Sequence, residues 1–209
     1  LSNPATYEPF QPEMIGRTRR IAAGKHSGST GIRASLMEMG FEPNNKQLKE
    51  IFLRVKSIGD KGKRVADADL QAIAEVVMGL PAVRPIKLEE ITVVTGSKVT
   101  STASVRLNLN GKMLTEAATG VGPVDAAISA IKKAVGIVEP IQLDNYSVKA
   151  ITGGTNAVTE VAVSISKGDR KATASGVNED IVIASVEAML SGMNVLMTDY
   201  NNKKVKEKS

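Results

Sequence analysis

The sequence of 209 residues contains no cysteine, no tryptophan and a single histidine, and only 3% of its residues are aromatic. Without cysteine, neither a disulfide framework nor a zinc site of the Cys-plus-His kind can form. One histidine, His26, cannot make a His-x-His metal pair, and few aromatic side chains are present on which nucleic-acid bases could stack. These absences argue against disulfide scaffolds, zinc enzymes and nucleic-acid binders.

Long apolar runs are also missing. No stretch approaches the ~18 residues that a membrane span needs, and residues 1–10 have neither the basic nor the apolar region of a signal peptide. We therefore expect a cytoplasmic protein with no membrane partner. Because the first residue is Leu1 rather than methionine, we also expect a fragment or a processed product.

Much of the net charge of +5 comes from a basic tail, residues 201–209, which holds four lysines against one glutamate. A short charged end of this kind is typical of a solvated terminus. Together with the low aromatic content, it predicts no nucleic-acid partner. The overall composition, 42% hydrophobic and 23% charged, is that of an ordinary globular chain.

The first 80 residues divide into an irregular arm or linker, 1–27, and a small helical subdomain, 28–80. The arm contains three closely spaced prolines. The subdomain carries three apolar stripes at helical spacing. These stripes and their capping residues predict three helices: about 29–39, one from Asn44 or Asn45, and one capped by Asp67 and ended by Gly79.

Over residues 88–200 the period changes from helical to strand-like. Between Val99 and Leu109 apolar or small residues alternate with polar ones, as in a half-buried strand, and Asn110-Gly111 is typical of a tight hairpin turn. A further strand and an amphipathic helix follow. The same order then recurs, with predicted strands at about 142–151, 157–166 and 170–175 and a helix at about 180–194.

An internal duplication accounts for this recurrence. The segments "TGVG" (119–122) and "SGVN" (175–178) each join a last strand to a helix, 56 residues apart. Two such units, about 88–137 and 140–196, can bury each other's open sheet faces, which neither can do alone. The sequence therefore predicts an α+β fold, with a short helical linker subdomain followed by a domain made of a duplicated three-strand-plus-helix unit.

The sharpest local motif is "GVGPVDAA" (120–127), at the start of a predicted helix. Gly120 and Gly122 would let the backbone approach a ligand, and Pro123 suits the first helical turn. Unpaired N–H groups at the helix start could bind a carboxylate or a phosphate. Two interpretations stay open: a small anion site, and a tight strand-to-helix turn with Asp125 as a first-turn charge. The third glycine of a dinucleotide fingerprint is absent.

Two other features also allow a functional and a structural interpretation. The segment "LDNY" (143–146) contains Tyr146, one of six aromatic residues, which suits either the wall of a small apolar pocket or core packing. The segment "GKHSG" (24–28) places His26 just before a helix. It suits either a cap and turn or a loop near another subunit's substrate.

These motifs and their order resemble the α-isopropylmalate synthase family, over nearly the whole chain except the basic tail. Citramalate synthase shares this architecture and many of the motifs, and homocitrate synthase resembles the first part less specifically. The segments that carry the resemblance are "TYEPFQPEMIG" (6–16), "GKHSG" (24–28), "VADADLQAIA" (65–74), "TGVGPVDAA" (119–127), "LDNY" (143–146), "GTNAVTEV" (154–161) and "SGVNEDIVIASVEAML" (175–190).

The resemblance implies the C-terminal part of such an enzyme, with linker subdomains followed by a regulatory domain over 88–200. The family's catalytic unit is a TIM barrel that holds a divalent metal and condenses acetyl-CoA with a 2-oxo acid. This chain has no βα repeat and is too short for a barrel of ~250 residues. We therefore expect no cofactor, no metal site and no activity from the chain alone, with Tyr7 and His26 as accessory residues near a neighbouring active site. The implied partners are a second copy and the barrel of its own chain.

The family's regulatory domain binds the end-product amino acid at a dimer interface for feedback inhibition. A helix start would hold the carboxylate, Asp125 or Asp144 the ammonium, and an apolar wall the side chain. Because Ala150 is small, we expect leucine as the effector, with isoleucine as the alternative. The residues that this resemblance carries over as effector-binding are Gly120, Gly122, Pro123, Val124, Asp125, Leu143, Asp144, Tyr146, Ala150 and Ala157.

The leading hypothesis is therefore the regulatory part of a 2-isopropylmalate synthase, which joins acetyl-CoA to 2-oxoisovalerate in leucine biosynthesis. One alternative is the regulatory domain of a citramalate synthase that binds isoleucine. Another, from a different class, is a free-standing module for amino-acid sensing or dimerisation. The arm over residues 6–28 favours an enzyme, because a free module would not need an arm that packs on a barrel.

Overall fold

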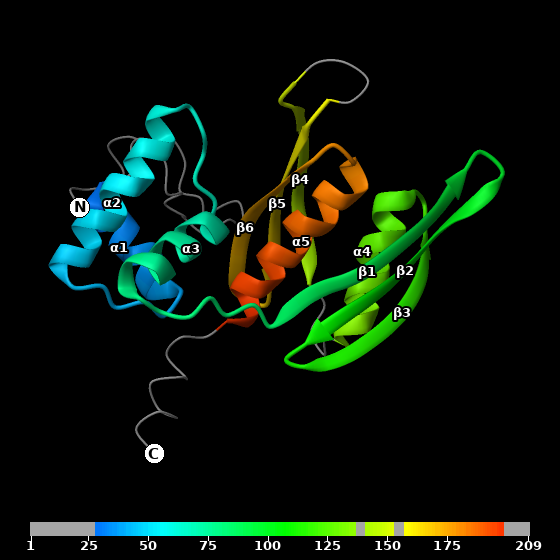
Figure 1. The fold of residues 1–209 in the computed structure, drawn as a ribbon, viewed down its shortest axis with the longest axis horizontal. Helices are drawn as coiled ribbons and strands as arrows, with labels where there is room; N and C mark the ends of the chain where they lie inside the picture. The colour runs from blue at the N-terminus through cyan, green and yellow to red at the C-terminus, as the bar shows by residue number, and fades with distance from the viewer. Residues whose placement is uncertain (1–27, 137–140, 153–156, 199–209) are drawn as a thin grey trace, which may run out of the picture.

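The structure is a computed structural model that describes residues 28–136, 141–152 and 157–198. The expectations for the arm, 1–27, and the basic tail, 201–209, lie outside these residues. No helix in the described part of the chain is long and apolar enough to cross a membrane. Figure 1 shows the helices of the N-terminal part gathered at one end of the molecule, beside two strand–helix units.

The predicted helical part consists of α1 (Ser29–Glu38), α2 (Asn45–Asp60) and α3 (Asp67–Met78). Asn44 begins α2 with a capping box: its side chain accepts from the Gln47 N–H, and the Gln47 side chain accepts from the Asn44 N–H. Gly79 ends α3 in the left-handed conformation, as predicted. The apolar stripes of the three helices and two residues of the connecting segments form a core of their own, with these buried residues: Ile32, Leu36, Phe41, Leu48, Ile51, Val55, Val65, Leu70 and Ala74.

The start of α3 differs from the prediction, because Asp67 does not cap this helix. Ala66 is the residue before the helix, and its N–H donates to the carboxylate of Asp69 at 2.9 Å. Asp67 instead bonds to Thr173, far along the chain. A capping carboxylate was correctly expected here, but it comes from two residues further on, which leaves Asp67 available for a tertiary contact.

The first unit comprises β1 (Ile86–Gly96), β2 (Val99–Leu109), β3 (Lys112–Gly120) and α4 (Pro123–Val135). Its strands form an antiparallel sheet in the order β1-β2-β3. Asn110 and Gly111 both have positive φ, 51° and 90°, which is the geometry that the hairpin prediction required. Alternate residues of β2, Ala103, Val105 and Leu107, are buried beneath α4.

The second unit repeats this order with β4 (Gln142–Ala150), β5 (Thr159–Lys167), β6 (Arg170–Asn178) and α5 (Ile181–Met197). Its sheet is also antiparallel, in the order β4-β5-β6. Some bounds differ from the prediction: β5 begins at Thr159 rather than 157, and β6 continues to Asn178 rather than 175. The helix that was expected over about 180–194 ends at Met197.

One continuous apolar core joins the two units, because α4 and α5 contact each other and each covers its own sheet. The α+β prediction is therefore confirmed. The equivalence between the units differs from the predicted spacing of 56. Their hairpin turns begin at Asn110 and Gly168, and their last helices begin at Pro123 and Ile181, which is 58 residues in both cases. The matching letters of "TGVG" and "SGVN" are thus not structurally equivalent.

Candidate functional site

The start of α4 offers backbone donors without a side-chain cap. Gly122 is the residue before the helix, and no side chain caps the first turn from this position. The carboxylate of Asp125 accepts from the Val121 N–H at 2.9 Å. It therefore stabilises the turn before α4 by this bond, and not by capping the N–H groups of the helix. Pro123, which has no N–H, and Val124 are half-buried at the same place. This arrangement can accept an external carboxylate at the helix N-terminus.

The two glycines of this turn have different roles. A Cβ at Gly120 would lie 2.3 Å from the Ala126 nitrogen, so this glycine allows α4 to pass close to the end of β3. A Cβ at Gly122 would meet nothing within 4 Å. The predicted close approach at Gly120 is therefore to the protein's own helix, whereas the space beside Gly122 is open.

The equivalent helix start in the second unit shows what a carboxylate does there. Asp180 stands 58 residues after Gly122, and its carboxylate accepts from the N–H groups of Val182 at 2.7 Å and Ile183 at 3.3 Å. The same fold element therefore binds a carboxylate in one unit and lacks one in the other. Sequence reasoning missed Asp180, because a spacing of 56 aligns Gly122 with Asn178.

Strand β4 presents the predicted apolar wall on one face. Tyr146 is opposite Val163, and Leu143 is opposite Ile165, so both belong to the face that carries the core residues of β5. Leu143 and Ala150 are nevertheless exposed, because the backbone of α5 passes close to β5 and β6 and not to β4. The wall is therefore present, but within the described part of one chain only Tyr146 is partly covered by a helix.

Tyr146 is fixed by a hydrogen bond that the sequence did not reveal. Its hydroxyl lies 2.7 Å from the Ser185 hydroxyl of α5, and Ser185 in turn donates to the Ile181 carbonyl at 2.5 Å. A serine has one hydroxyl proton, so Tyr146 must be the donor in the pair. The tyrosine side chain therefore bridges β4 and the first turn of α5.

Two other predicted residues do not join this wall. Asp144 lies at the bulge between Leu143 and Asn145; its carboxylate accepts from the Ser166 hydroxyl at 2.9 Å and lies 3.9 Å from the Lys171 ammonium. Ser166 alternates with Ile165, so Asp144 faces the opposite side of the sheet from Tyr146. Ala157 is half-buried just before β5.

The turn at the start of α4 and the wall on β4 are separate in one chain. Among the described residues, β4 contacts β5 and makes no contact with α4 or β3. The structure thus contains both halves of the predicted effector site without bringing them together. Tyr7 and His26 lie outside the described residues.

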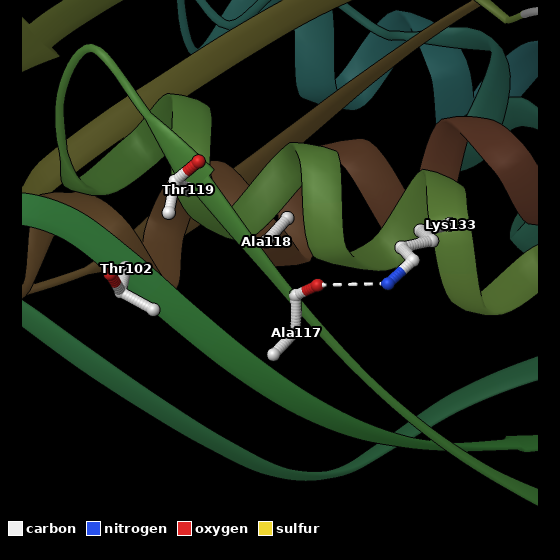
Figure 2. A pocket seen from close by; sticks show the side chains of 5 residues that line it. All are labelled: Thr102, Ala117, Ala118, Thr119 and Lys133. Carbon is white, nitrogen blue, oxygen red and sulfur yellow. Dashed lines mark hydrogen bonds between the residues drawn. The ribbon is translucent and has the colours of Figure 1, made fainter.

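A shallow hollow occurs elsewhere, along β3 at the edge of the first sheet. Figure 2 shows Thr102 beside Thr119, with Lys133 reaching over the edge of β3 to the Ala117 carbonyl at 3.4 Å. Lys133 also pairs with Glu116. None of the predicted effector residues lines this hollow.

A metal site is not formed in the part of the chain that the structure describes. There, no three His, Cys, Asp or Glu side chains come together in a way that could hold a metal ion. The resemblance places the family's divalent metal in the catalytic barrel and not in these residues, and we derive no chemistry from it.

Comparison with known families divides the chain in two. Residues 64–197 match the family described as the LeuA allosteric (dimerisation) domain. Residues 1–63 match the family described as the homocitrate synthase post-HMGL domain-like family. The join between the two matches falls before α3, so α3 belongs by sequence with the two strand–helix units.

Individual relatives carry two kinds of name. A protein assigned as (R)-citramalate synthase from Methanosarcina mazei is 50% identical over 94% of this chain and 41% of its own length. From Methanocaldococcus jannaschii, a 2-isopropylmalate synthase and an (R)-citramalate synthase are both 47% identical over 94% of this chain, and over 39% and 40% of their own lengths. The chain thus spans about two fifths of the length of the relatives it matches.

Proposed function

The chain belongs to the LeuA allosteric (dimerisation) domain family, and we propose that it is the regulatory part of a synthase that condenses acetyl-CoA with a 2-oxo acid. The match over residues 64–197 and the names of the relatives support this proposal. Because the described residues hold no complete catalytic set, the chain alone should show no condensation. The regulatory role would be to bind an end-product amino acid.

The observation that carries the proposal is the difference between two equivalent helix starts. In α5 the N–H groups of the first turn bind the carboxylate of Asp180, whereas in α4 the equivalent residue is Gly122. An amino acid could place its α-carboxylate where Asp180 places its own. Asp125, in the first turn of α4, would then provide a negative charge near the ammonium.

A second copy of the chain would complete the site. The β4 wall and the α4 start do not meet in one chain, and the wall leaves Leu143 37% and Val148 45% exposed. In a dimer, the wall of one copy could lie against the helix start of the other. The effector's side chain would then fill the space between Tyr146, Leu143 and Ala150, and binding would depend on assembly.

The proposed effector is a branched-chain amino acid, with leucine first. The small Ala150 at the end of β4 leaves room for a side chain that branches one carbon further out. Isoleucine is the second candidate, and it is favoured by the relatives assigned as (R)-citramalate synthase. The two ligands differ by one methyl position, which is worth ~1–3 kcal/mol in a pocket.

Titration calorimetry on the whole chain tests this proposal, with leucine, isoleucine, valine and aspartate as ligands. We expect heat with at least one branched-chain ligand and none with aspartate. Gly122→Asp should abolish the heat, because the new carboxylate would occupy the same N–H groups. Gly28→Asp is the matched control, since Gly28 also precedes a helix and also has open space beside it.

Three results would contradict the proposal: no heat with any branched-chain ligand, unchanged binding in Gly122→Asp, or equal loss in both aspartate variants. Ala150→Ile separates the wall from the helix start. It should weaken leucine binding by filling the space for the side chain, and it should leave the folded state intact because Ala150 is exposed.

Dimerisation through β4 has its own test. Val148→Asp puts a charge on the exposed wall and should weaken the dimer at least ~10-fold, because the carboxylate would lose its hydration in the interface. Met113→Asp is the control, since Met113 is 49% exposed on β3, an edge strand of the other sheet. Sedimentation over a concentration series measures both; equal effects of the two variants would exclude β4 as the contact.

A further inference from the structure

Helix α3 belongs to two parts of the molecule at once. By sequence it lies inside the match to the allosteric domain, which begins at residue 64. Its apolar side, however, is part of the core of the helical cluster, α1–α3, where Leu70 and Ala74 are fully buried with residues of α1 and α2. Any mechanical link between the second unit and the helical cluster must therefore include α3.

Three hydrogen bonds join the start of α3 to β6. The Asp67 N–H donates to the Thr173 hydroxyl at 3.0 Å. The Thr173 N–H and hydroxyl both donate to one carboxylate oxygen of Asp67, at 2.8 and 2.9 Å. The bond to Asp67 shows that the N–H of Thr173 points away from β5, and because β6 is an edge strand, no further strand is there to pair with it. Asp67 supplies that missing acceptor, across 106 residues of sequence.

Apolar packing between these parts is slight. The two apolar cores are separate, and Ala68 is the one apolar residue of the described helical cluster that packs against the larger core. A single alanine contributes little burial energy, whereas hydrogen bonds to a charged group are among the stronger ones in proteins. Asp67 therefore supplies strong polar contacts that hold the start of α3 against β6, in addition to the contact of α3 with α5.

The segment that follows α3 is also held by polar contacts. Arg84 donates from both terminal nitrogens to the carboxylate of Glu75, at 2.9 and 3.1 Å, and Glu75 is buried in α3. Next along the chain, Asn194 of α5 bonds to both backbone groups of Ile86, at 2.8 and 2.9 Å. The segment after α3 is therefore bound to α3 through Arg84 and, two residues later, to α5 through Ile86.

We propose that Asp67 and Thr173 form a latch that fixes the helical cluster to the edge of β6, so that any displacement of the second unit is carried into α3. In the latch, the Asp67 carboxylate accepts a hydrogen bond from an outward N–H group of the edge strand β6. This strand thereby connects the apolar core of the helical cluster with the larger core. With the latch broken, the connecting segment and the contact of α3 with α5 remain, but the start of α3 is no longer fixed to β6. The angle between the two cores would then vary more.

Spin-label distances on the whole chain test the latch directly. The sequence has no cysteine, so labels at Leu53→Cys in α2 and Asp169→Cys in the turn after β5, both exposed and away from β4, report the distance between the two parts. The labelled chains are diluted with unlabelled chains, so that distances between two copies do not contribute. We expect one narrow distance distribution in the parent and a broad or shifted one in Asp67→Ala. The matched control is Asp60→Ala, which removes an exposed carboxylate at the end of α2.

Hydrogen exchange supplies a second, local measurement. The Thr173 amide should exchange at least ~10-fold faster in Asp67→Ala, since a hydrogen bond to a charged group is lost. Thr173→Val keeps the side-chain shape and removes only the hydroxyl, so it should broaden the distances less than Asp67→Ala. An unchanged distance distribution in both variants, or equal broadening in Asp60→Ala, would overturn the proposal.

If Asp67→Ala fails to fold, the decision rests on Thr173→Val, and parent-like distances there would count against the latch. No ligand is needed, so the outcome is independent of amino-acid binding.

Discussion

In the first strand–helix unit the residue before α4 is Gly122, and in the second unit the residue before α5 is Asp180. The strands differ as well: β1 is held at Ile86 by the side chain of Asn194, whereas β4 is exposed along almost its whole length. One unit thus leaves its helix start open and secures its first strand. The other closes its helix start and leaves its first strand open.

This contrast shows that duplication need not produce two equal sites. Each unit keeps the elements that the core requires, which are three strands and a covering helix. The features that a ligand or a partner could use are divided between the units, and each occurs once in a chain. Two chains would then supply two complete sets, which is the arrangement that a symmetric dimer favours.

The largest loss of stability should come from substitution of the two glycines that α4 and α5 approach most closely. A Cβ at Gly176 would lie 2.2 Å from the Ala184 carbonyl oxygen, and one at Gly120 would lie 2.3 Å from the Ala126 nitrogen. Because both obstacles are backbone atoms, Gly176→Ala and Gly120→Ala should each cost about 3 kcal/mol of unfolding free energy. Denaturant unfolding measures this. Gly122→Ala, with open space around it, should change stability far less, and equal losses at all three positions would contradict the difference in roles.

Removal of the bond that secures β1 should have the next largest effect. Asn194→Ala would leave the N–H and carbonyl of Ile86 buried without these partners, and we expect a loss of about 2–3 kcal/mol. Hydrogen exchange should show faster exchange at Ile86 than in the middle of β2. Stability within ~0.5 kcal/mol of the parent would mean that the open and secured first strands do not differ in the way described.

The smallest effect should come from the cap of α5. Asp180→Ala should cost about 1 kcal/mol, and Asp180→Gly only a few tenths, because glycine is itself tolerated before a helix. Both can be measured by thermal unfolding. Neither should create a second amino-acid site detectable by calorimetry, because the Tyr146 side chain already lies against the beginning of α5 in the same chain. A second binding event in Asp180→Gly would show that the helix start alone is sufficient.

Local patterns predicted the elements well. The alternation from Val99 to Leu109 and the Asn110-Gly111 turn gave a strand and a hairpin with the observed bounds, because each depends on neighbours in sequence. The helix ends at Gly79 and the cap at Asn44 were correct for the same reason. Asp67 was misassigned because aspartate suits both a cap and a tertiary contact, and composition alone does not distinguish them.

Contacts between residues far apart in the chain could not be predicted from the sequence. Thr173, Ser185 and Asn194 look like ordinary small polar residues in a strand and a helix. Their importance depends on partners that are 106, 39 and 108 residues away. The unit spacing was misjudged because the letters of "TGVG" and "SGVN" agree, although Gly120 meets the first turn of its helix and Gly176 meets the next turn. The effector residues remain a prediction; the structure locates those in its described part without testing their role.

The bond between Asn194 and Ile86 also decides when the chain can finish folding during synthesis. The first strand emerges from the ribosome 108 residues ahead of the side chain that secures it. Until α5 has been made, the backbone groups at the start of β1 must be hydrated, and the core shared by α4 and α5 cannot close. Contacts of such long sequence separation form late and slow the final step. A ribosome stalled before residue 194 should therefore hold a chain whose first hairpin is formed and whose β1 is still open to exchange.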